Sequence, residues 1–216
     1  MAKKKEYAVG IDIGGTTTKF GIVDHRGDIL YRGVIATNKY DTVEPYLDDL
    51  FEALSPAIDE AGGINTIKGI GIGAPNGNFY TGTIEYAPNL RWKGIIPLAK
   101  MINEKFAVPA ALTNDANAAA VGEMMYGAAK GMKDFIMITL GTGVGSGIVA
   151  NGQLILGHDG FAGELGHTII VPGGRLHKNT GHRGPLEAYT SATGVALTAV
   201  EFLEQRPNKK TLLRNY

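Results

Sequence analysis

A turn of glycines and threonines near the start of the chain is the first place where the residue types favour a chemical role. Gly14-Gly15-Thr16-Thr17 follows the apolar stretch 7–13, and the chain then continues as a strand from Lys19. Successive backbone N–H groups in such a turn form a concave site for anionic oxygens, and threonine hydroxyls add small donors. A hairpin whose glycines need positive φ is the structural alternative for an isolated glycine pair. The threonines favour a phosphate site.

A second turn of this kind occurs at Gly141-Thr142-Gly143. Residues 11–30 and 138–155 both consist of a strand, a Gly/Thr turn, a Gly-Ile-Val strand and a further glycine turn before an apolar segment. This approximate repeat predicts two related lobes, residues 1–112 and 113–216, that face each other across a cleft. Each lobe would then contribute one phosphate turn.

Two carboxylates stand where such turns would need them. Asp12 directly precedes the first turn, where it can hold Mg²⁺ through water while the ion bridges phosphate oxygens. A hydrogen-bonded carboxylate at a strand end explains Asp12 equally well. Asp115 follows a predicted strand end and opens a helix, a position at which open α/β sheets bind ligands. For Asn114 and Asp115 the structural alternative is capping of that helix.

Apolar periodicity predicts the elements that position these residues. Strands are expected at 7–13, 19–23, 28–31, 67–72, 109–113 and 134–140, and amphipathic or Ala-rich helices at 42–61, 98–106 and 114–126. The first three strands are joined by tight turns and form a meander. Strands first and alternating helices and strands afterwards favour an α/β layered fold.

Four motifs together resemble the ROK family of bacterial sugar kinases and related repressors. They are DIGGTTTK, TNDANAAAVGE, ITLGTGVGSGIVANGQLILGHDGFAGELGH and GHRGPLEAYTSATG, which lie in this order between about Val9 and Gly194. The family belongs to the actin-like, ribonuclease-H-like ATPase superfamily, so the resemblance implies two α/β lobes around a central cleft. It also implies ATP-dependent phosphorylation of a hexose at its 6-hydroxyl, with glucose as the first candidate and ATP and Mg²⁺ as cofactors.

The resemblance assigns roles residue by residue. Asp115 would be the general base, and Asn114 would hydrogen-bond the sugar. ATP and its metal would be bound by Asp12, Gly14, Gly15, Thr16, Thr17, Lys19, Gly141, Thr142 and Gly143. The other sugar contacts would be Asn89, Glu164, His167 and Glu187, with Gly73 and Ala74 lining the pocket through their backbone. Taken singly, an asparagine after proline is a common turn residue, and a lone histidine or glutamate is more often structural or solvated.

One segment departs from the family pattern. Many members carry C-x-C-G-x-x-G-C-x-E, in which three thiolates and a histidine bind a structural zinc that braces the sugar loop. This chain contains no cysteine, and Lys178, Thr180 and Pro185 take the cysteine positions. The usual zinc site therefore cannot form, and no resident structural metal is expected. A substitute site built from three histidines is the alternative: His167, His177 and His182.

The two ends of the chain suggest further expectations. Family members usually continue beyond this point with a segment that closes over adenosine, so we expect an incomplete second lobe and weak or absent ATP binding. A non-catalytic sugar-binding fragment is one alternative. A ROK repressor is disfavoured, because its DNA-binding domain would precede a phosphate motif that here begins at about residue 9.

Composition limits the partners. The chain has 21 basic and 21 acidic residues and a formal net charge of zero, which gives no electrostatic reason to expect nucleic acid or a membrane as partners. No apolar stretch approaches the roughly 18 residues of a membrane span. We expect a cytoplasmic homo-oligomer, most simply a dimer, as related enzymes form. Which hexose it takes depends on pocket shape, so fructose, mannose, allose and N-acetylhexosamines stay open.

Overall fold

The computed structural model describes residues 5–215, which form two compact units. The first unit contains the chain up to Phe135 together with residues 147–162. The second contains residues 136–146 and the chain from Gly163 onward. The chain therefore crosses between the units three times. The predicted division into lobes at about Leu112 stays a prediction.

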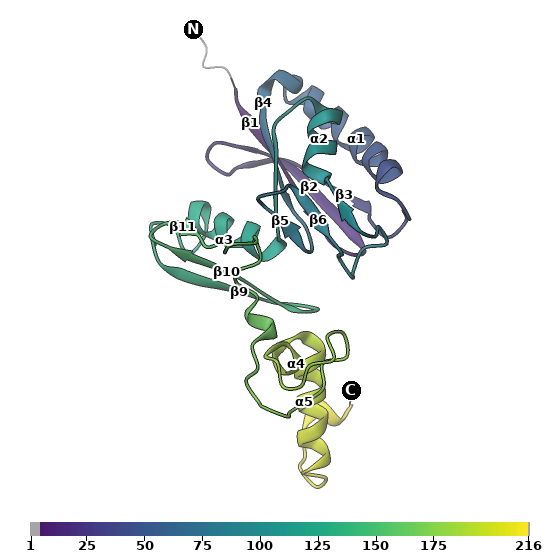
Figure 1. Cartoon of the computed structure of the whole chain (residues 1–216), viewed down its shortest axis with the longest axis vertical. Helices are drawn as coiled ribbons and strands as arrows, with labels where there is room; N and C mark the ends of the chain where they lie inside the picture. The colour runs from purple at the N-terminus through teal and green to yellow at the C-terminus, as the bar shows by residue number, and fades with distance from the viewer. Residues whose placement is uncertain (1–4, 216) are drawn as a thin grey trace. The chain divides into compact units, whose positions relative to one another are not determined.

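A five-stranded sheet organises the first unit (Figure 1). Its order is β3-β2-β1-β4-β8, with the bounds β1 Tyr7–Ile13, β2 Thr17–Asp24, β3 Ile29–Ala36, β4 Ile67–Gly73 and β8 Ala110–Thr113. The first three strands are antiparallel neighbours, which confirms the predicted meander, and β1, β4 and β8 are parallel. The carboxyl ends of these three parallel strands meet at one edge of the sheet.

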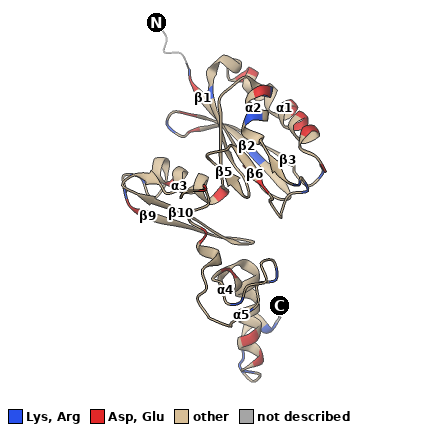
Figure 2. Ribbon diagram, viewed as in Figure 1, with Lys and Arg blue, Asp and Glu red and all other residues tan. Residues whose placement is uncertain are grey.

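Three helices accompany this sheet. They are α1 Val43–Glu60, α2 Leu98–Phe106 and α3 Asp115–Tyr126, and all three were predicted from the sequence within one residue at each end. Helix α1 buries an apolar stripe that includes Tyr46, Leu50 and Leu54, and its solvent side is acidic (Figure 2). The strands, α1 and α2 share one continuous apolar core that covers most of the first unit.

A second, smaller sheet in this unit was not predicted from the sequence. It consists of β5 Gly77–Asn78, β6 Thr83–Glu85 and β7 Ile95–Ile96, in that order, and the short helix η1 spans Ile64–Thr66. Strands of two or three residues are too short to show a periodic pattern. Polar contacts help to hold this sheet, because the Glu85 carboxylate accepts hydrogen bonds from Asn78 and Thr83.

The remaining elements follow α3. Strands β9 Phe135–Leu140, β10 Val144–Ala150 and β11 Gln153–Leu154 occur in the predicted order of the repeat, and β10 pairs with β11 in antiparallel fashion. The second unit continues with η2 Leu165–His167, α4 Glu187–Thr190, α5 Ala192–Glu204 and η3 Leu212–Asn215. Within the described part of the chain, no helix combines the length and apolar character that a membrane crossing requires.

Candidate functional site

The parallel strands bring several predicted residues to one edge of the first unit. In the register of the sheet, Asp12 at the end of β1 pairs with Gly73 at the end of β4, and Gly73 pairs with Thr113 at the end of β8. Asn114 and Asp115 follow directly. A Cβ on Gly73 would lie 3.5 Å from the Asp115 Cα, so the backbone of β4 runs close against the start of α3. Asp12, Gly73 and Asp115 therefore share one edge.

The capping alternative is resolved in favour of Asn114. Its side-chain oxygen accepts a hydrogen bond of 2.6 Å from the backbone N–H of Asn117, and Asn114 is the N-cap of α3. Asp115 is the first helical residue and its carboxylate is exposed, with one oxygen accepting from the Ala116 N–H at 2.9 Å. The Asp115 side chain is therefore not the cap of α3, and its carboxylate lies at the positive end of the helix dipole.

Asp12 occupies a negative environment. Partial burial at the strand end, and then the negative charge of Asp115, raise the pKa of the Asp12 carboxyl above its usual value, whereas Lys19 lowers it. The side chain nevertheless reaches solvent. Carboxylate oxygens are the ligands that Mg²⁺ prefers, and a divalent cation would offset this repulsion. The acidic pair at this edge therefore fits a magnesium ion.

The first glycine turn joins β1 to β2. The Gly14 N–H donates to the Thr17 carbonyl at 3.0 Å, and neither Gly14 nor Gly15 has positive φ. The alternative explanation through positive φ is therefore wrong. Gly15 is needed for another reason: a Cβ there would lie 2.7 Å from the Asn89 carbonyl oxygen. This close approach places the predicted sugar residue Asn89 against the predicted phosphate turn.

The threonines of the first turn divide between solvent and core. Thr16 and Thr17 are exposed, as a ligand contact requires. Thr18 is fully buried, and its hydroxyl hydrogen-bonds Thr37 at 2.8 Å and Tyr46 at 3.1 Å. Burial raises the pKa of the Tyr46 phenol, which therefore stays neutral. The sequence did not reveal this structural role of Thr18, although strand alternation after the turn was the available signal.

The second glycine turn lies in the second unit and is bound to Glu187. One carboxylate oxygen, Glu187 Oε2, accepts a hydrogen bond of 2.7 Å from the Val144 N–H. A Cβ on Gly143 would lie 2.6 Å from the same oxygen. The other oxygen, Oε1, lies 2.8 Å from His177 Nε2. The fold thus brings a predicted sugar residue, Glu187, onto a predicted phosphate turn, and it adds His177, whose role the sequence left open.

Two further predicted sugar residues lie together in the second unit. His167 Nε2 is 3.8 Å from Glu164 Oε2, and both side chains are about half exposed. The His167 and His177 rings are 6.3 Å apart between centroids, while His182 is exposed. Across residues 5–215, no three His, Asp or Glu side chains gather as a metal ion would require. The three-histidine alternative therefore gains no support from the described residues.

The predicted residues fall into two sets. The first unit holds Asp12, Gly14, Gly15, Thr16, Thr17, Lys19, Gly73, Ala74, Asn89, Asn114 and Asp115. The second unit holds Gly141, Thr142, Gly143, Glu164, His167 and Glu187. Each set combines one glycine turn with polar side chains suited to hydroxyl groups.

Comparison with known proteins gives consistent matches. The profile described as ROK family matches residues 8–214. A glucokinase of Halalkalibacterium halodurans is 40% identical over 209 residues, which cover 96% of this chain and 63% of that protein. The crystal structure of a ROK family glucokinase from Streptomyces griseus, in complex with glucose and AMPPNP, superposes with a TM-score of 0.75 at 36% identity and covers 93% of this chain and 62% of that one.

Transcriptional repressors also match this chain. A xylose repressor of Bacillus subtilis is 34% identical over 193 residues, which cover 88% of this chain and 49% of that protein. The chain thus spans less than two thirds of the length of these relatives. Its α/β architecture is that of the actin-like ATPases to which the matched kinase structures belong.

Proposed function

The chain belongs to the ROK family, and from that premise we propose that it takes part in ATP-dependent phosphorylation of a hexose at the 6-hydroxyl, with glucose as the preferred sugar. The observation that carries the proposal is the edge shared by Asp12, Gly73 and Asp115, with a glycine turn beside it. The similarity to glucokinases, one of them solved with glucose and AMPPNP, supports the choice of substrates.

In this proposal Asp115 is the general base. Its exposed carboxylate accepts the proton of the 6-hydroxyl while the hydroxyl oxygen bonds to the γ-phosphorus and the bond from that phosphorus to the ADP oxygen breaks. Asn114, Asn89, Glu164, His167 and Glu187 hydrogen-bond the hexose, and the backbone of Gly73 and Ala74 lines its pocket. A positioned hydroxyl is what this reaction demands most of the protein.

The phosphate groups are assigned to the two glycine turns. Backbone N–H groups and the exposed Thr16 and Thr17 hydroxyls, with Lys19 and Thr142, would hold the phosphate oxygens. Asp12 would hold Mg²⁺, which when bound neutralises negative charge on the transferred group. A cytoplasmic location and a dimeric state remain predictions.

The test is Mg²⁺-ATP-dependent phosphorylation of a panel of hexoses by the 216-residue chain. We expect glucose to give glucose 6-phosphate, and Asp115→Asn to lower turnover by about 10²- to 10⁴-fold, the range of a general base, while glucose binding measured by calorimetry persists. Asp159→Asn is the matched control, since that carboxylate is 82% exposed. Equal turnover in Asp115→Asn would contradict the assignment of the base.

Other outcomes separate the alternatives. Product from fructose, mannose, allose or an N-acetylhexosamine in place of glucose would keep the kinase and change its substrate. Hexose binding with no product and no effect of nucleotide would indicate a non-catalytic sugar-binding protein. The xylose repressor matches favour a second candidate, a sugar-sensing regulator, which would bind a sugar such as xylose without phosphorylating it.

A further inference from the structure

The loop from Arg175 to Arg183, which lacks the cysteines of the family pattern, is ordered by hydrogen bonds in this chain. Its two sides form an isolated antiparallel bridge between Leu176 and Arg183. The His177 N–H donates to the His182 carbonyl at 2.8 Å, and the Gly184 N–H donates to the Arg175 carbonyl at 2.8 Å. Backbone hydrogen bonds therefore join the two sides of the loop, and the side chains of the loop bind it to the rest of the unit.

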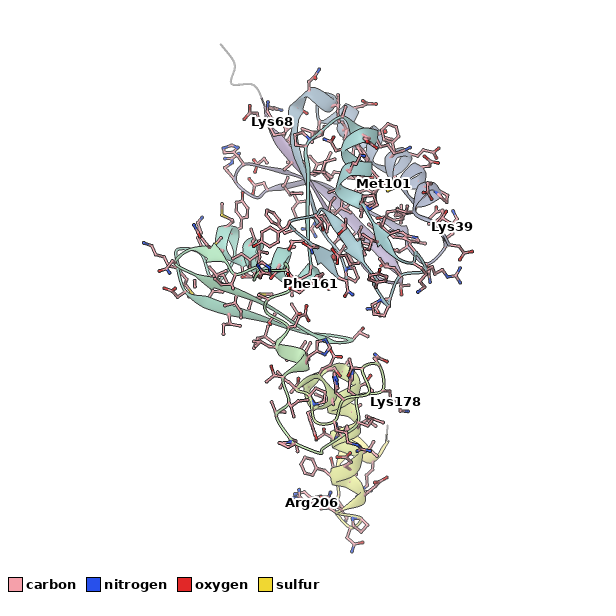
Figure 3. The ribbon with its side chains drawn as sticks, in the orientation of Figure 1. Lys39, Lys68, Met101, Phe161, Lys178 and Arg206 are labelled. Carbon is pink, nitrogen blue, oxygen red and sulfur yellow. The ribbon has the colours of Figure 1, made fainter. Side chains whose placement is uncertain are left out.

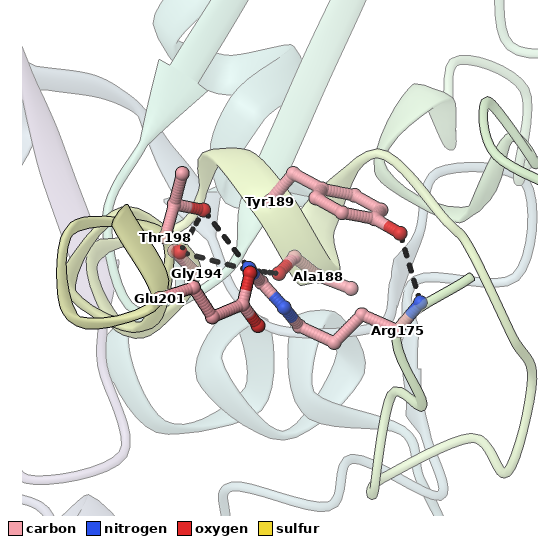
Figure 4. Close-up of polar contacts among 6 residues, drawn as sticks. All are labelled: Arg175, Ala188, Tyr189, Gly194, Thr198 and Glu201. Atoms are coloured by element: carbon pink, nitrogen blue, oxygen red, sulfur yellow. Dashed lines mark hydrogen bonds and ion pairs between the residues drawn. The ribbon is translucent and has the colours of Figure 1, made fainter. Parts of the chain in front are cut away.

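Arg175 anchors the base of the loop (Figure 4). Its Nη1 donates to the carbonyls of Ala188 and Gly194 at 2.6 and 3.0 Å, and its Nη2 donates to Thr198 and to the Glu201 carboxylate at 3.1 and 2.8 Å. These bonds attach the base to α4 and α5. Because they involve none of the residues near the tip, a change at the tip should leave the base in place.

His177 makes the contact between the tip and the rest of the unit. Its Nδ1 lies 2.9 Å from the Thr180 hydroxyl, and its Nε2 lies 2.8 Å from Glu187 Oε1. The His177 and Glu187 side chains are only 13% and 14% exposed. When the Thr180 hydroxyl donates to Nδ1, a neutral ring carries its N–H on Nε2 and donates it to the carboxylate. Two partners at opposite nitrogens hold the ring in one orientation.

Glu187 continues this chain of contacts to the glycine turn. Its second oxygen accepts from the Val144 N–H at 2.7 Å, and the lack of a side chain at Gly143 gives this oxygen room, because a Cβ there would lie 2.6 Å from it. Thr180, which stands at a position where the family pattern has a cysteine, is thus linked through His177 and Glu187 to the backbone of the turn.

We infer that His177, oriented by Thr180, is a positioning residue that braces Glu187 and the second glycine turn without a metal. The inference rests on the proposed function for its consequence, because Glu187 is there a sugar contact and the turn a phosphate site. Its structural part stands independently of that function. Loss of the His177 side chain frees the Glu187 carboxylate, and the Val144 N–H loses a fixed acceptor.

The first experiment measures hydrogen exchange of the Val144 amide by NMR in the full chain. His177→Ala should accelerate this exchange by at least about tenfold, the effect of losing one hydrogen bond to a charged group. His177→Gln keeps an amide N–H that can donate to Glu187 and should restore most of the protection. His182→Ala, at an exposed position on the same loop, should leave it unchanged. Unchanged exchange in His177→Ala would overturn the inference.

A second readout uses trypsin, because Lys178 and Arg183 are exposed on this loop (Figure 3 labels Lys178). Cleavage after Lys178, which is near the tip, should accelerate in His177→Ala, recover in His177→Gln and stay unaffected when wild-type protein is treated with a zinc chelator. Faster cleavage of the chelated wild type would show that a metal is the brace and would overturn the inference. Accelerated cleavage with unchanged Val144 exchange would also overturn it, since the loop would then be uncoupled from the turn.

The third readout concerns the sugar. His177→Ala should raise the dissociation constant for hexose, and the KM where turnover is measured, with a smaller effect on kcat, and His177→Gln should reverse this. If wild-type protein neither binds nor phosphorylates any hexose, the proposed function fails while the exchange and cleavage experiments still decide the brace. If wild-type protein binds hexose and His177→Ala binds it equally well, the positioning role is overturned.

Discussion

The ionised carboxylate of Asp12, a residue of the candidate site, destabilises the folded protein. Partial burial and the charge of Asp115 raise its pKa in the folded chain above 3.8, the usual value. The folded protein therefore binds a proton more tightly than the unfolded chain, and stability falls as the pH rises from about 3.8 through the raised pKa. Such an unfavourable charge is typical of a site arranged for a ligand.

The first prediction follows from this sign. Asp12→Asn should raise the melting temperature at pH 7, because it removes a carboxylate that is disfavoured in the folded state. The difference from wild type should shrink as the pH falls through the raised pKa, and it should vanish well below 3.8, where Asp12 is protonated in both states. Thermal unfolding followed by circular dichroism across this range is the measurement, with Asp28→Asn, whose side chain is 73% exposed, as the control. An Asn variant less stable than wild type at pH 7 would contradict the prediction.

At the scale of the elements, the start of α3 combines a structural and a chemical residue in adjacent positions. Asn114 caps the helix, while Asp115 projects its carboxylate to solvent. Asn114→Ala should lower the free energy of unfolding by about 1 kcal/mol, the usual loss for an N-cap. Asn114→Asp keeps an acceptor for the Asn117 N–H and should be close to wild type in urea denaturation. Equal losses in both variants would show that the cap contributes little.

The approach of the first turn to the Asn89 loop gives a second prediction at this scale. Gly15→Ala places a Cβ 2.7 Å from the Asn89 carbonyl oxygen, so the loop must move. We expect a loss of about 1–3 kcal/mol in stability, as for overpacking elsewhere, together with weaker hexose binding. Gly10→Ala in β1 is the matched control, because a Cβ there meets nothing within 4 Å. Calorimetric titration with hexose and urea denaturation test both effects, and a Gly15→Ala chain that behaves like Gly10→Ala would contradict this account.

At the scale of the whole molecule, the two units differ in how much apolar surface they bury. Every member of the continuous core cluster, from Tyr7 to Leu112, belongs to the first unit. In the second unit many large apolar side chains are exposed, among them Ile138, Leu140, Val195, Leu197, Val200, Phe202, Leu212 and Leu213. Hydrophobic burial is the main favourable contribution to folding, so the second unit has less of it per residue.

This difference predicts unequal local stability. Amides of α5 should exchange with solvent at a lower free energy of opening than amides of β1 and β4, because regions with few buried apolar contacts open most readily. Hydrogen exchange followed by mass spectrometry on the full chain would separate the two. The prediction requires that α5 peptides exchange well before the strands of the first unit. Protection of α5 as strong as that of β1 would contradict it.

The sequence by itself determined the local parts of this protein. Hydrophobic periodicity located α1, α2, α3 and the main strands. In an amphipathic helix or a half-buried strand, apolar residues recur along the sequence at the period of that element. The turns at Gly14 and Gly143 and the position of Asp115 after a strand were also visible, since each depends on a few consecutive residues. The family resemblance, now confirmed over residues 8–214, rested on these local motifs.

Only the tertiary structure decided which distant residues meet. It paired Glu187 with Val144 and His177, brought Asn89 against Gly15, and turned the Thr18 hydroxyl into the core towards Tyr46. It also contains α5 and the short strands β5 to β7, which were not predicted from the hydrophobic periodicity of the sequence. The physical reason is that these features arise from packing between segments far apart in the chain, and the free energy of such packing depends on the whole fold.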